Sequence, residues 1–376
     1  MIRGSSGEEL LWIEDYIEET SQILNFYKRI TKQIAGEIKV ELTPEEEQLL
    51  AKSIFVDREA YKAYLRGNNY AEDLSHESLI EARDYLTTAI EKDPDWAPLY
   101  GAMATVWLSI GSMGVESPEV AIPVVYEYLN KALELDPDLA EAHYVSAFMA
   151  FAAEWDWKKA EKEFMKALDI NPNHVFSRIH YSHMLYILQR PDEAQMQADM
   201  AYRLDPLNPL IQSTYALTLL CESDCASALS VVEKVLASDP DNFLANNVVD
   251  AAAFQCGDLD RVFEAEKQKQ PLEEGLMNEI ERIYNKNGFH AAYEEIMRHL
   301  EVLAKTNYVT PADMAIKYYM INQDDKVMEW IEKGVEVRDP STLYIGTGYL
   351  NFTRLYDNPR FIKVFEKLKL PLPKSN

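Results

Sequence analysis

A proline preceded by Asp or Asn recurs through the middle of the chain, and its spacing constrains the fold more than any other feature. The prolines are Pro94, Pro137, Pro172, Pro206 and Pro240, at successive intervals of 43, 35, 34 and 34 residues. Each follows an apolar stretch of helical periodicity, and proline ends a helix because it lacks an amide hydrogen and restricts the residue before it. We therefore predict a series of helical units of similar length.

Small residues occur at fixed places within these units. The residues five positions before the prolines are Ala89, Ala132, Ala167, Ala201 and Val235. Small side chains let two helices approach closely, and a period of about 34 residues built from two helices is that of the tetratricopeptide repeat. The sequence therefore predicts an all-α fold: a tetratricopeptide-repeat superhelix, an α-solenoid of antiparallel helix pairs with a C-terminal capping helix.

The repeat pattern divides the chain into five parts. We expect a tag-like or disordered start at 1–10, an N-terminal helical segment at 11–56, a regular array at 57–242, divergent helix pairs at 243–342, and a C-terminal cap at 343–376. The apolar stripe of residues 11–39 is typical of a helix, which we interpret as the remnant of an upstream domain. Terminal repeats are expected to diverge because one of their faces meets water.

The segments around the repeats resemble those of a known family. They read LWIEDY (11–16), KVELTPEEE (39–47), AYKAYLRG (60–67), EWDW (154–157) and DPSTLYIG (339–346). In this order they look like the tetratricopeptide half of bacterial signalling proteins, in which the region follows a winged-helix, nucleotide cyclase or protein kinase domain. The resemblance implies a sensory or scaffolding part whose output domain, and any membrane span, would lie upstream.

The charge balance excludes some partners. The chain has 37 Lys and Arg against 63 Asp and Glu, a net charge of -26. Such a surface repels nucleic-acid phosphates and anionic membranes, so we expect neither contact from this region. The expected partner is a protein or peptide, basic or amphipathic, and the exposed end faces of a solenoid also allow a homodimer. Localisation stays open at this point: the cytoplasm is favoured, and the periplasm is the alternative if a membrane span lies upstream.

The first helices of a tetratricopeptide superhelix line its concave face. The side chains expected there are Tyr144, Phe148, Phe151, Ile179, His183, Tyr186, Leu217, Leu220, Asn247 and Phe254. Such an apolar and aromatic groove suits an amphipathic helix or an extended peptide. Each aromatic has an alternative role, because large rings also pack between neighbouring helices.

Candidate metal and redox residues have weaker patterns. His180 and His183 are three residues apart on an expected helix, with His174 nearby, but no third ligand has a fixed spacing. We expect ordinary histidines and no metal. The three cysteines, Cys221, Cys225 and Cys256, are too few and odd in number for a disulfide framework. Cys221 and Cys225 are interpreted as two small buried hydrophobes in preference to a redox pair.

The remaining features concern contacts and catalysis. Trp155 and Trp157 are expected to staple adjacent repeats, or to form an exposed contact point. No GxGxxG, Walker A or GxSxG motif occurs, so we expect no cofactor and no catalytic residue.

These observations predict a non-catalytic scaffold that binds a protein or peptide within a bacterial signal-transduction or transcription-regulatory protein. The alternative is a module that senses a small molecule in the same groove, near His183 and Tyr186. An enzyme is the weakest hypothesis for this region, although an enzymatic domain could precede it.

Overall fold

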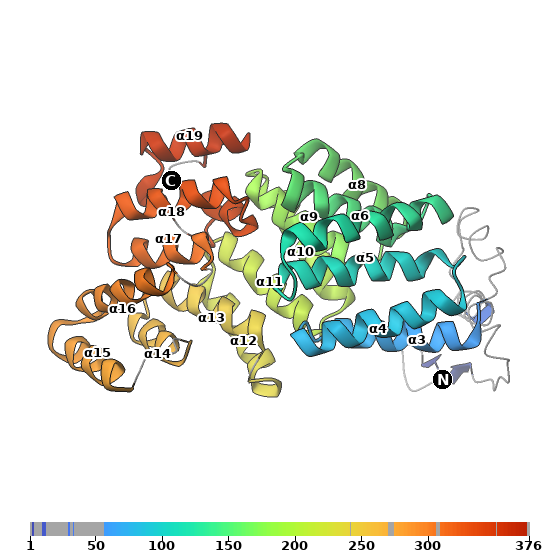
Figure 1. Ribbon diagram of the computed structural model, residues 1–376, viewed down its shortest axis with the longest axis horizontal. Helices are drawn as coiled ribbons and strands as arrows, with labels where there is room; N and C mark the ends of the chain where they lie inside the picture. Colours follow the sequence, from blue (N-terminus) through green and yellow to red (C-terminus); the bar gives the residue numbers. More distant parts are fainter. Residues whose placement is uncertain are drawn as a thin grey trace. The chain divides into compact units, whose positions relative to one another are not determined.

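The computed structural model describes residues 2–3, 10–12, 29–30, 33, 56–240, 242–269, 274–305, 309–350 and 352–373. Over these residues the chain is built almost entirely from helices, which follow one another as antiparallel pairs (Figure 1). The predicted all-α tetratricopeptide-repeat fold is confirmed. The chain forms two compact units, residues 1–145 and 146–376, which we describe separately.

The first unit contains two helix pairs and the start of a third. Its helices are α3 (Arg58–Ala71), α4 (His76–Lys92), α5 (Ala97–Ser112), α6 (Pro118–Leu135) and α7 (Ala140–Met149), which continues into the second unit. Asp57 begins α3 by accepting hydrogen bonds from the amides of Glu59 and Ala60, which would otherwise lack partners. Between the paired helices, Ala82 and Ala89 are fully buried, as the small-residue pattern predicts.

A short β-ladder lies near the start of the chain. Strand β1 (Ile2–Arg3) pairs antiparallel with β2 (Leu10–Trp12). The helix expected to begin at Leu11 is therefore wrong for Leu11 and Trp12, whose backbone groups bond to another strand. The remainder of the expected segment 11–56, apart from residues 29–30 and 33, and most of the tag-like start lie outside the described residues.

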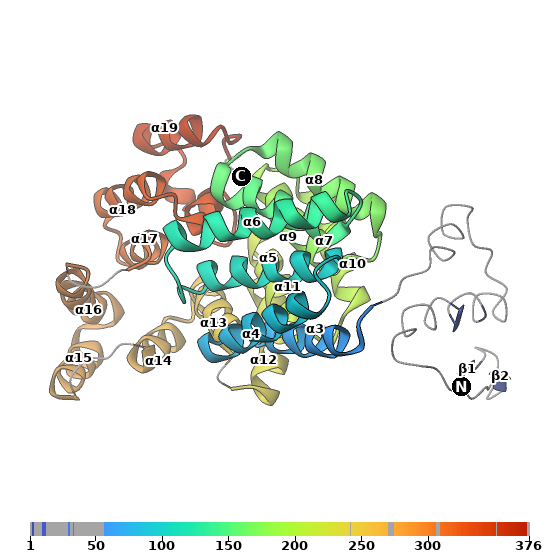
Figure 2. The same cartoon turned by 45° about the vertical axis from the view of Figure 1, so that its right-hand side comes forward.

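The second unit continues the helix pairs. It begins with η2 (Ala150–Glu154), a π-helical extension of α7. Its other elements are α8 (Trp157–Ile170), α9 (Val175–Ile187), α10 (Pro191–Leu204), α11 (Pro209–Cys221), α12 (Cys225–Ser238), α13 (Phe243–Gln255), α14 (Leu259–Lys269), α15 (Glu274–Asn287), α16 (Phe289–Leu303), α17 (Pro311–Met320), α18 (Asp324–Glu336), η3 (Pro340–Gly346), η4 (Thr353–Leu355) and α19 (Pro359–Leu368). Helices α15 and α16 lie side by side in both views (Figures 1 and 2).

The turns inside successive pairs share one backbone geometry. Trp155, Gln189, Ser223 and Gly257 have φ between +57° and +77°, and each follows the previous one by 34 residues. Left-handed backbone reverses the chain within one residue, at a cost of roughly 1–2 kcal/mol for a residue other than glycine. The repeat is therefore set by a recurring turn shape even where no glycine marks it.

The end of the second unit returns to its beginning. The indole Nε1 of Trp157 donates to the carbonyl of Leu368 at 3.0 Å, although the two residues are 211 positions apart. Arg338 donates to the carbonyl of Ala153 at 2.8 Å, and its guanidinium lies 5.2 Å from the ring centre of Trp155. Both tryptophans thus hold the C-terminal elements, and the expectation that they staple adjacent repeats is corrected.

One pair of cysteines forms a disulfide. Cys225, the first residue of α12, is bonded to Cys256, which follows α13, while Cys221 is a buried free thiol. The interpretation of Cys221 and Cys225 as two small buried hydrophobes is therefore confirmed for Cys221 and wrong for Cys225. Cys225 and Cys256 each lie within two residues of a left-handed turn, and stacking of successive repeats brings these two turns together.

Candidate functional site

The ten side chains expected on the concave face fall into two groups. Six are buried: Tyr144 in the first unit, and Phe151, Ile179, His183, Tyr186 and Leu220 in the second. Four are half-buried, all in the second unit: Phe148, Leu217, Asn247 and Phe254. Their contact with a partner remains a prediction, but the structure explains why much of this face is covered.

Residues 340–350, which we name the inner segment, lie against the first helices of three repeats in the second unit. The segment comprises the 3₁₀ helix η3 and the turn that follows it. Its apolar side chains are deeply buried, with Leu343 and Ile345 at most 1% exposed. The tyrosine rings also take part, because Tyr344 lies edge-on to His183 of α9 at 5.8 Å, and Tyr349 packs on the core of α11, α12 and α13. The inner segment therefore fills part of the surface predicted for a partner.

Hydrogen bonds to its backbone hold the inner segment in place. The amide of Gly348 donates to the carbonyl of Cys221 at 3.0 Å. The side-chain amide of Gln255 donates to the carbonyl of Gly348 at 2.6 Å, and that of Gln189 donates to the carbonyl of Gly346 at 2.9 Å. Helices α11 and α13 and the turn after α9 each contribute one such bond, so the wall holds this segment partly through main-chain groups.

Glycine is required where the inner segment crosses α11. A Cβ atom added to Gly348 would lie 2.5 Å from the carbonyl oxygen of Cys221 and 2.6 Å from that of Leu220. These are backbone atoms and cannot swing away. The crossing is thus possible because residue 348 has no side chain.

His183 connects the inner segment to two helices. Its Nε2 lies 3.2 Å from the carbonyl oxygen of Thr214, and its Nδ1 lies 2.8 Å from the hydroxyl of Tyr344. A carbonyl can only accept, so Nε2 carries the hydrogen and the Tyr344 hydroxyl donates to Nδ1. Burial lowers the pKa of His183 to about 3, with a smaller contribution from His180. The imidazole is neutral at pH 7, and both of its nitrogens are occupied.

The other two histidines also have protein partners. Nδ1 of His180 lies 3.0 Å from the carbonyl of Phe176, and burial lowers the pKa of His180 to about 4. Nδ1 of His174 accepts from the amide of Ser177 at 3.1 Å and caps α9. Within the described ranges, no group of three His, Cys, Asp or Glu residues is arranged to hold a metal ion.

A buried ion pair lies among the later helices of the second unit. Nζ of Lys317 on α17 is 2.7 Å from a carboxylate oxygen of Glu266 on α14, and both side chains are less than 9% exposed. The hydroxyl of Tyr293 donates to the same oxygen at 3.3 Å. Burial raises the pKa of Tyr293. Burial alone would lower the pKa of Lys317, but Tyr293 and the carboxylates of Asp313 and Glu266 hold that pKa well above its usual range. This arrangement keeps three polar groups satisfied inside the core.

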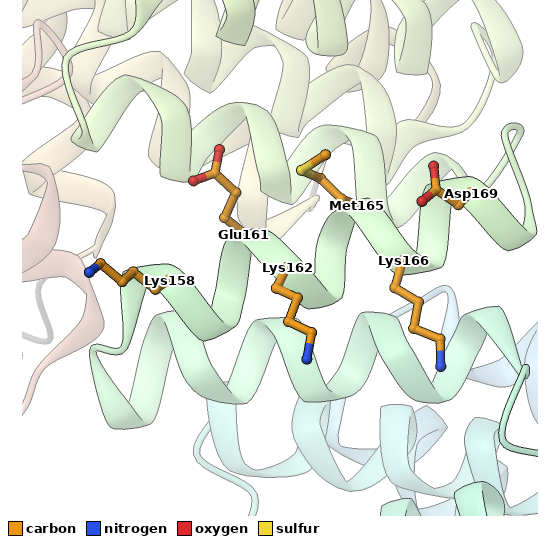
Figure 3. Close-up of a pocket in the computed structure, with 6 residues that line it drawn as sticks. All are labelled: Lys158, Glu161, Lys162, Met165, Lys166 and Asp169. Atoms are coloured by element: carbon orange, nitrogen blue, oxygen red, sulfur yellow. The ribbon is translucent and has the colours of Figure 1, made fainter.

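An open depression of about 490 Å³ lies on α8, lined by Lys158, Glu161, Lys162, Met165, Lys166 and Asp169. Figure 3 shows that Lys162 and Lys166 project from one side of the helix, whereas Glu161 and Met165 project from the other. It is a shallow surface feature, separate from the inner segment.

The inner segment was not predicted from the sequence. The expected boundary between the divergent helix pairs (243–342) and the C-terminal cap (343–376) passes through the inner segment. This stretch, DPSTLYIGTGYL, has no helical periodicity. The available signal was the pair Gly346 and Gly348 between tyrosines, since glycine in a non-helical apolar stretch indicates close backbone approach. No sequence pattern indicated that Cys221, Gln189 and Gln255 would contact this segment.

Comparison with known proteins gives a partial match to one curated relative. No protein-family model matches the chain. A stretch of 165 residues is 26% identical to a Rhizobium meliloti (strain 1021) protein named "Putative adenylate cyclase 3" and covers 43% of this chain. The match spans only 27% of that relative's length.

Several solved structures are similar to this chain at low sequence identity. A tetratricopeptide-repeat protein of Thermus thermophilus is 16% identical, with a TM-score of 0.41, over 52% of this chain and 99% of that one. Yeast Tom70 is 19% identical, with a TM-score of 0.44, over 83% and 69% of the two chains. Human IFIT1, solved as a dimer with PPP-AAAA, is 14% identical, with a TM-score of 0.45, over 84% and 90%. These likenesses concern the fold alone. Among the residues described, no helix is both long and apolar enough to cross a membrane.

Proposed function

We propose that this chain is a non-catalytic scaffold that binds another protein within a bacterial signal-transduction or transcription-regulatory protein. The repeat fold supports a binding role, since stacked helix pairs present a long surface for a partner. The signalling setting is supported by the resemblance of the flanking segments and by the partial match to a protein named as a cyclase.

One observation supports this proposal above the others: the inner wall of the second unit already holds a polypeptide. It does so through the bonds of Gly348, Gln255 and Gln189, which recognise main-chain groups present in any peptide. The wall therefore has the chemistry of a peptide site. By contrast, the Tyr344 hydroxyl occupies the place near His183 where a small molecule was expected.

The partner would contact the half-buried part of the wall beside the inner segment. Phe148 is the strongest anchor, because its ring meets Phe151 edge-on at 6.0 Å and His180 at 5.0 Å. Aromatic side chains held in this way carry much of the energy of protein interfaces. Leu217 and Phe254 extend the same apolar surface along α11 and α13.

Site-specific crosslinking in the source bacterium tests this proposal. A benzophenone amino acid at position 148 should give a discrete crosslinked band, whereas the same group at Val302, which is 62% exposed on α16, should not. Phe148→Glu should abolish capture of that partner, while the matched Val302→Glu retains it. The proposal fails if Phe148→Glu melts at the wild-type temperature and still captures the same protein.

A further inference from the structure

Helix α10 carries a row of exposed apolar side chains that no described element covers. Met196, Met200 and Leu204 follow one another at four-residue intervals and are 56%, 41% and 39% exposed. Leu207, just beyond the helix, is 84% exposed. Single exposed apolar residues are ordinary, but a contiguous row marks a contact surface.

Met165 on α8 extends this row toward the neighbouring pair. Glu161, one helical turn before Met165, is paired with Arg190 at the start of α10 at 2.6 Å. Figure 3 shows Glu161 and Met165 projecting from the same side of α8, so Met165 lies on the edge next to α10. Met165 is 51% exposed, and the five apolar side chains together form a patch on the order of 500 Å².

The charge of this region differs from that of the rest of the chain. Residues 157–207 contain seven Lys and Arg and seven Asp and Glu, although the whole chain has a net charge of -26. Two copies of so acidic a chain repel each other across most of their surface. Repulsion is weaker across a region of balanced charge, so this is where a second copy can approach.

The ends of α10 carry opposite charges. Asp192 and Glu193 lie in its first turn and Arg203 in its last turn. Glu193 is already paired with Arg190 at 2.6 Å, whereas Asp192 and Arg203 have no ion-pair partner within the described part of the chain. If two copies of α10 lie antiparallel, Asp192 of each faces Arg203 of the other. The two helix dipoles then point in opposite directions, which is also favourable.

We propose that the outer face of α10 docks on the same face of a second copy about a two-fold axis between Met196 and Met200. In such an isologous contact the same residues of both copies form the interface, so the assembly stops at a dimer and does not extend into a filament. Methionine suits this position because its flexible, polarisable side chain adapts to a copy of itself. The proposal does not depend on the partner of the inner wall.

Sedimentation velocity on the full chain tests the contact. The wild type should be a dimer at micromolar concentration, and Met200→Glu should raise the dissociation constant by about tenfold or more because it places two carboxylates in an apolar contact. Val302→Glu, an equally charged change on α16, should leave the dimer intact. A chain that stays monomeric up to about 100 µM, or a dimer unaffected by Met200→Glu, overturns the proposal.

A charge exchange tests the antiparallel arrangement separately. Asp192→Arg and Arg203→Glu should each weaken the dimer, and the double variant should restore it, because the opposite charges again face each other. Both positions are on the surface, so folding should be unaffected, as circular dichroism can verify. A double variant that is weaker than both single variants would refute the two-fold pairing.

Discussion

Replacement of Gly348 by alanine isolates the contact between the inner segment and α11. The added methyl group would lie 2.5 Å from the Cys221 carbonyl oxygen and 2.6 Å from both the Leu220 carbonyl oxygen and the Ser223 hydroxyl. Real Cβ atoms do not approach oxygen so closely, so the inner segment must move away from the helix. Gly348 does not have a positive φ, and alanine can therefore adopt its backbone conformation without strain.

The size of the effect follows from what the movement breaks. Forcing a methyl group into a filled site costs typically about 1–3 kcal/mol. The shift also lengthens the bonds of the Gly348 amide to Cys221 and of Gln255 to the Gly348 carbonyl, each worth about 1 kcal/mol net. We expect Gly348→Ala to lower the free energy of unfolding of the second unit by about 2–5 kcal/mol.

The same substitution elsewhere in the chain provides the control. Gly275 lies in the first turn of α15, and an added Cβ would meet nothing within 4 Å. Gly275→Ala should therefore leave stability unchanged or raise it by about 0.5–1 kcal/mol, because alanine loses less backbone entropy in a helix. The opposite signs of these two variants separate steric clash from the general effect of removing a glycine.

Urea unfolding, followed by circular dichroism and by hydrogen exchange of the α9 and α11 amides, measures both variants. Exchange is informative because the two units can unfold in separate steps. A Gly348→Ala protein within about 0.5 kcal/mol of the wild type, with unchanged protection in α11, would show that the inner segment does not rest on this helix.

Three further changes have defined outcomes. Lys317→Met leaves the buried Glu266 carboxylate without its partner and should cost about 3–5 kcal/mol in urea unfolding, most of it regained when Glu266→Leu is added; equal stability of single and double variants would contradict this. The pKa of His183 is about 3 in the folded protein and 6.5 in the unfolded chain. Its contribution to the free energy of unfolding is therefore complete above pH 6.5 and is lost as the pH falls from 6.5 toward 3, at up to about 1.4 kcal/mol per pH unit. His183→Gln should make the stability less dependent on pH in this acidic range. Thiol titration in denaturant should find one thiol before reduction and three afterwards, and reduction of the Cys225–Cys256 bond should destabilise the protein by about 3–4 kcal/mol; three thiols without reductant would refute the disulfide.

Much of the fold could be predicted because the repeat is a local pattern. The small residues expected where paired helices approach, Ala89, Ala132, Ala167 and Ala201, are all fully buried. Proline, small residues and apolar periodicity act over distances of a few residues, so a single sequence reveals them. The left-handed turns follow from the same spacing even at Trp155 and Gln189, where the residue type gives no hint.

The candidate site was harder to predict because its contacts join residues far apart in the chain. His183 and Tyr344 are 161 positions apart, and repeat proteins are normally held together by neighbouring units. Side chains such as Ile179 and Tyr186 were correctly placed on first helices, but nothing local indicated how deeply they are buried. The disulfide could have been proposed from the repeat spacing, because Cys225 and Cys256 flank equivalent turns of consecutive repeats.

The hydrogen bond from Trp157 to Leu368 also affects how the protein folds during synthesis. A ribosome adds roughly 5–20 residues per second, so the 211 residues between these partners take on the order of 10–40 s to synthesise. For part of that interval the apolar wall of α9, α11 and α13 has been made but residues 340–350, which cover it, have not. Newly made copies therefore pass through a period in which this wall can attract chaperones or other nascent chains, and translation speed downstream of α13 will affect the yield of folded protein.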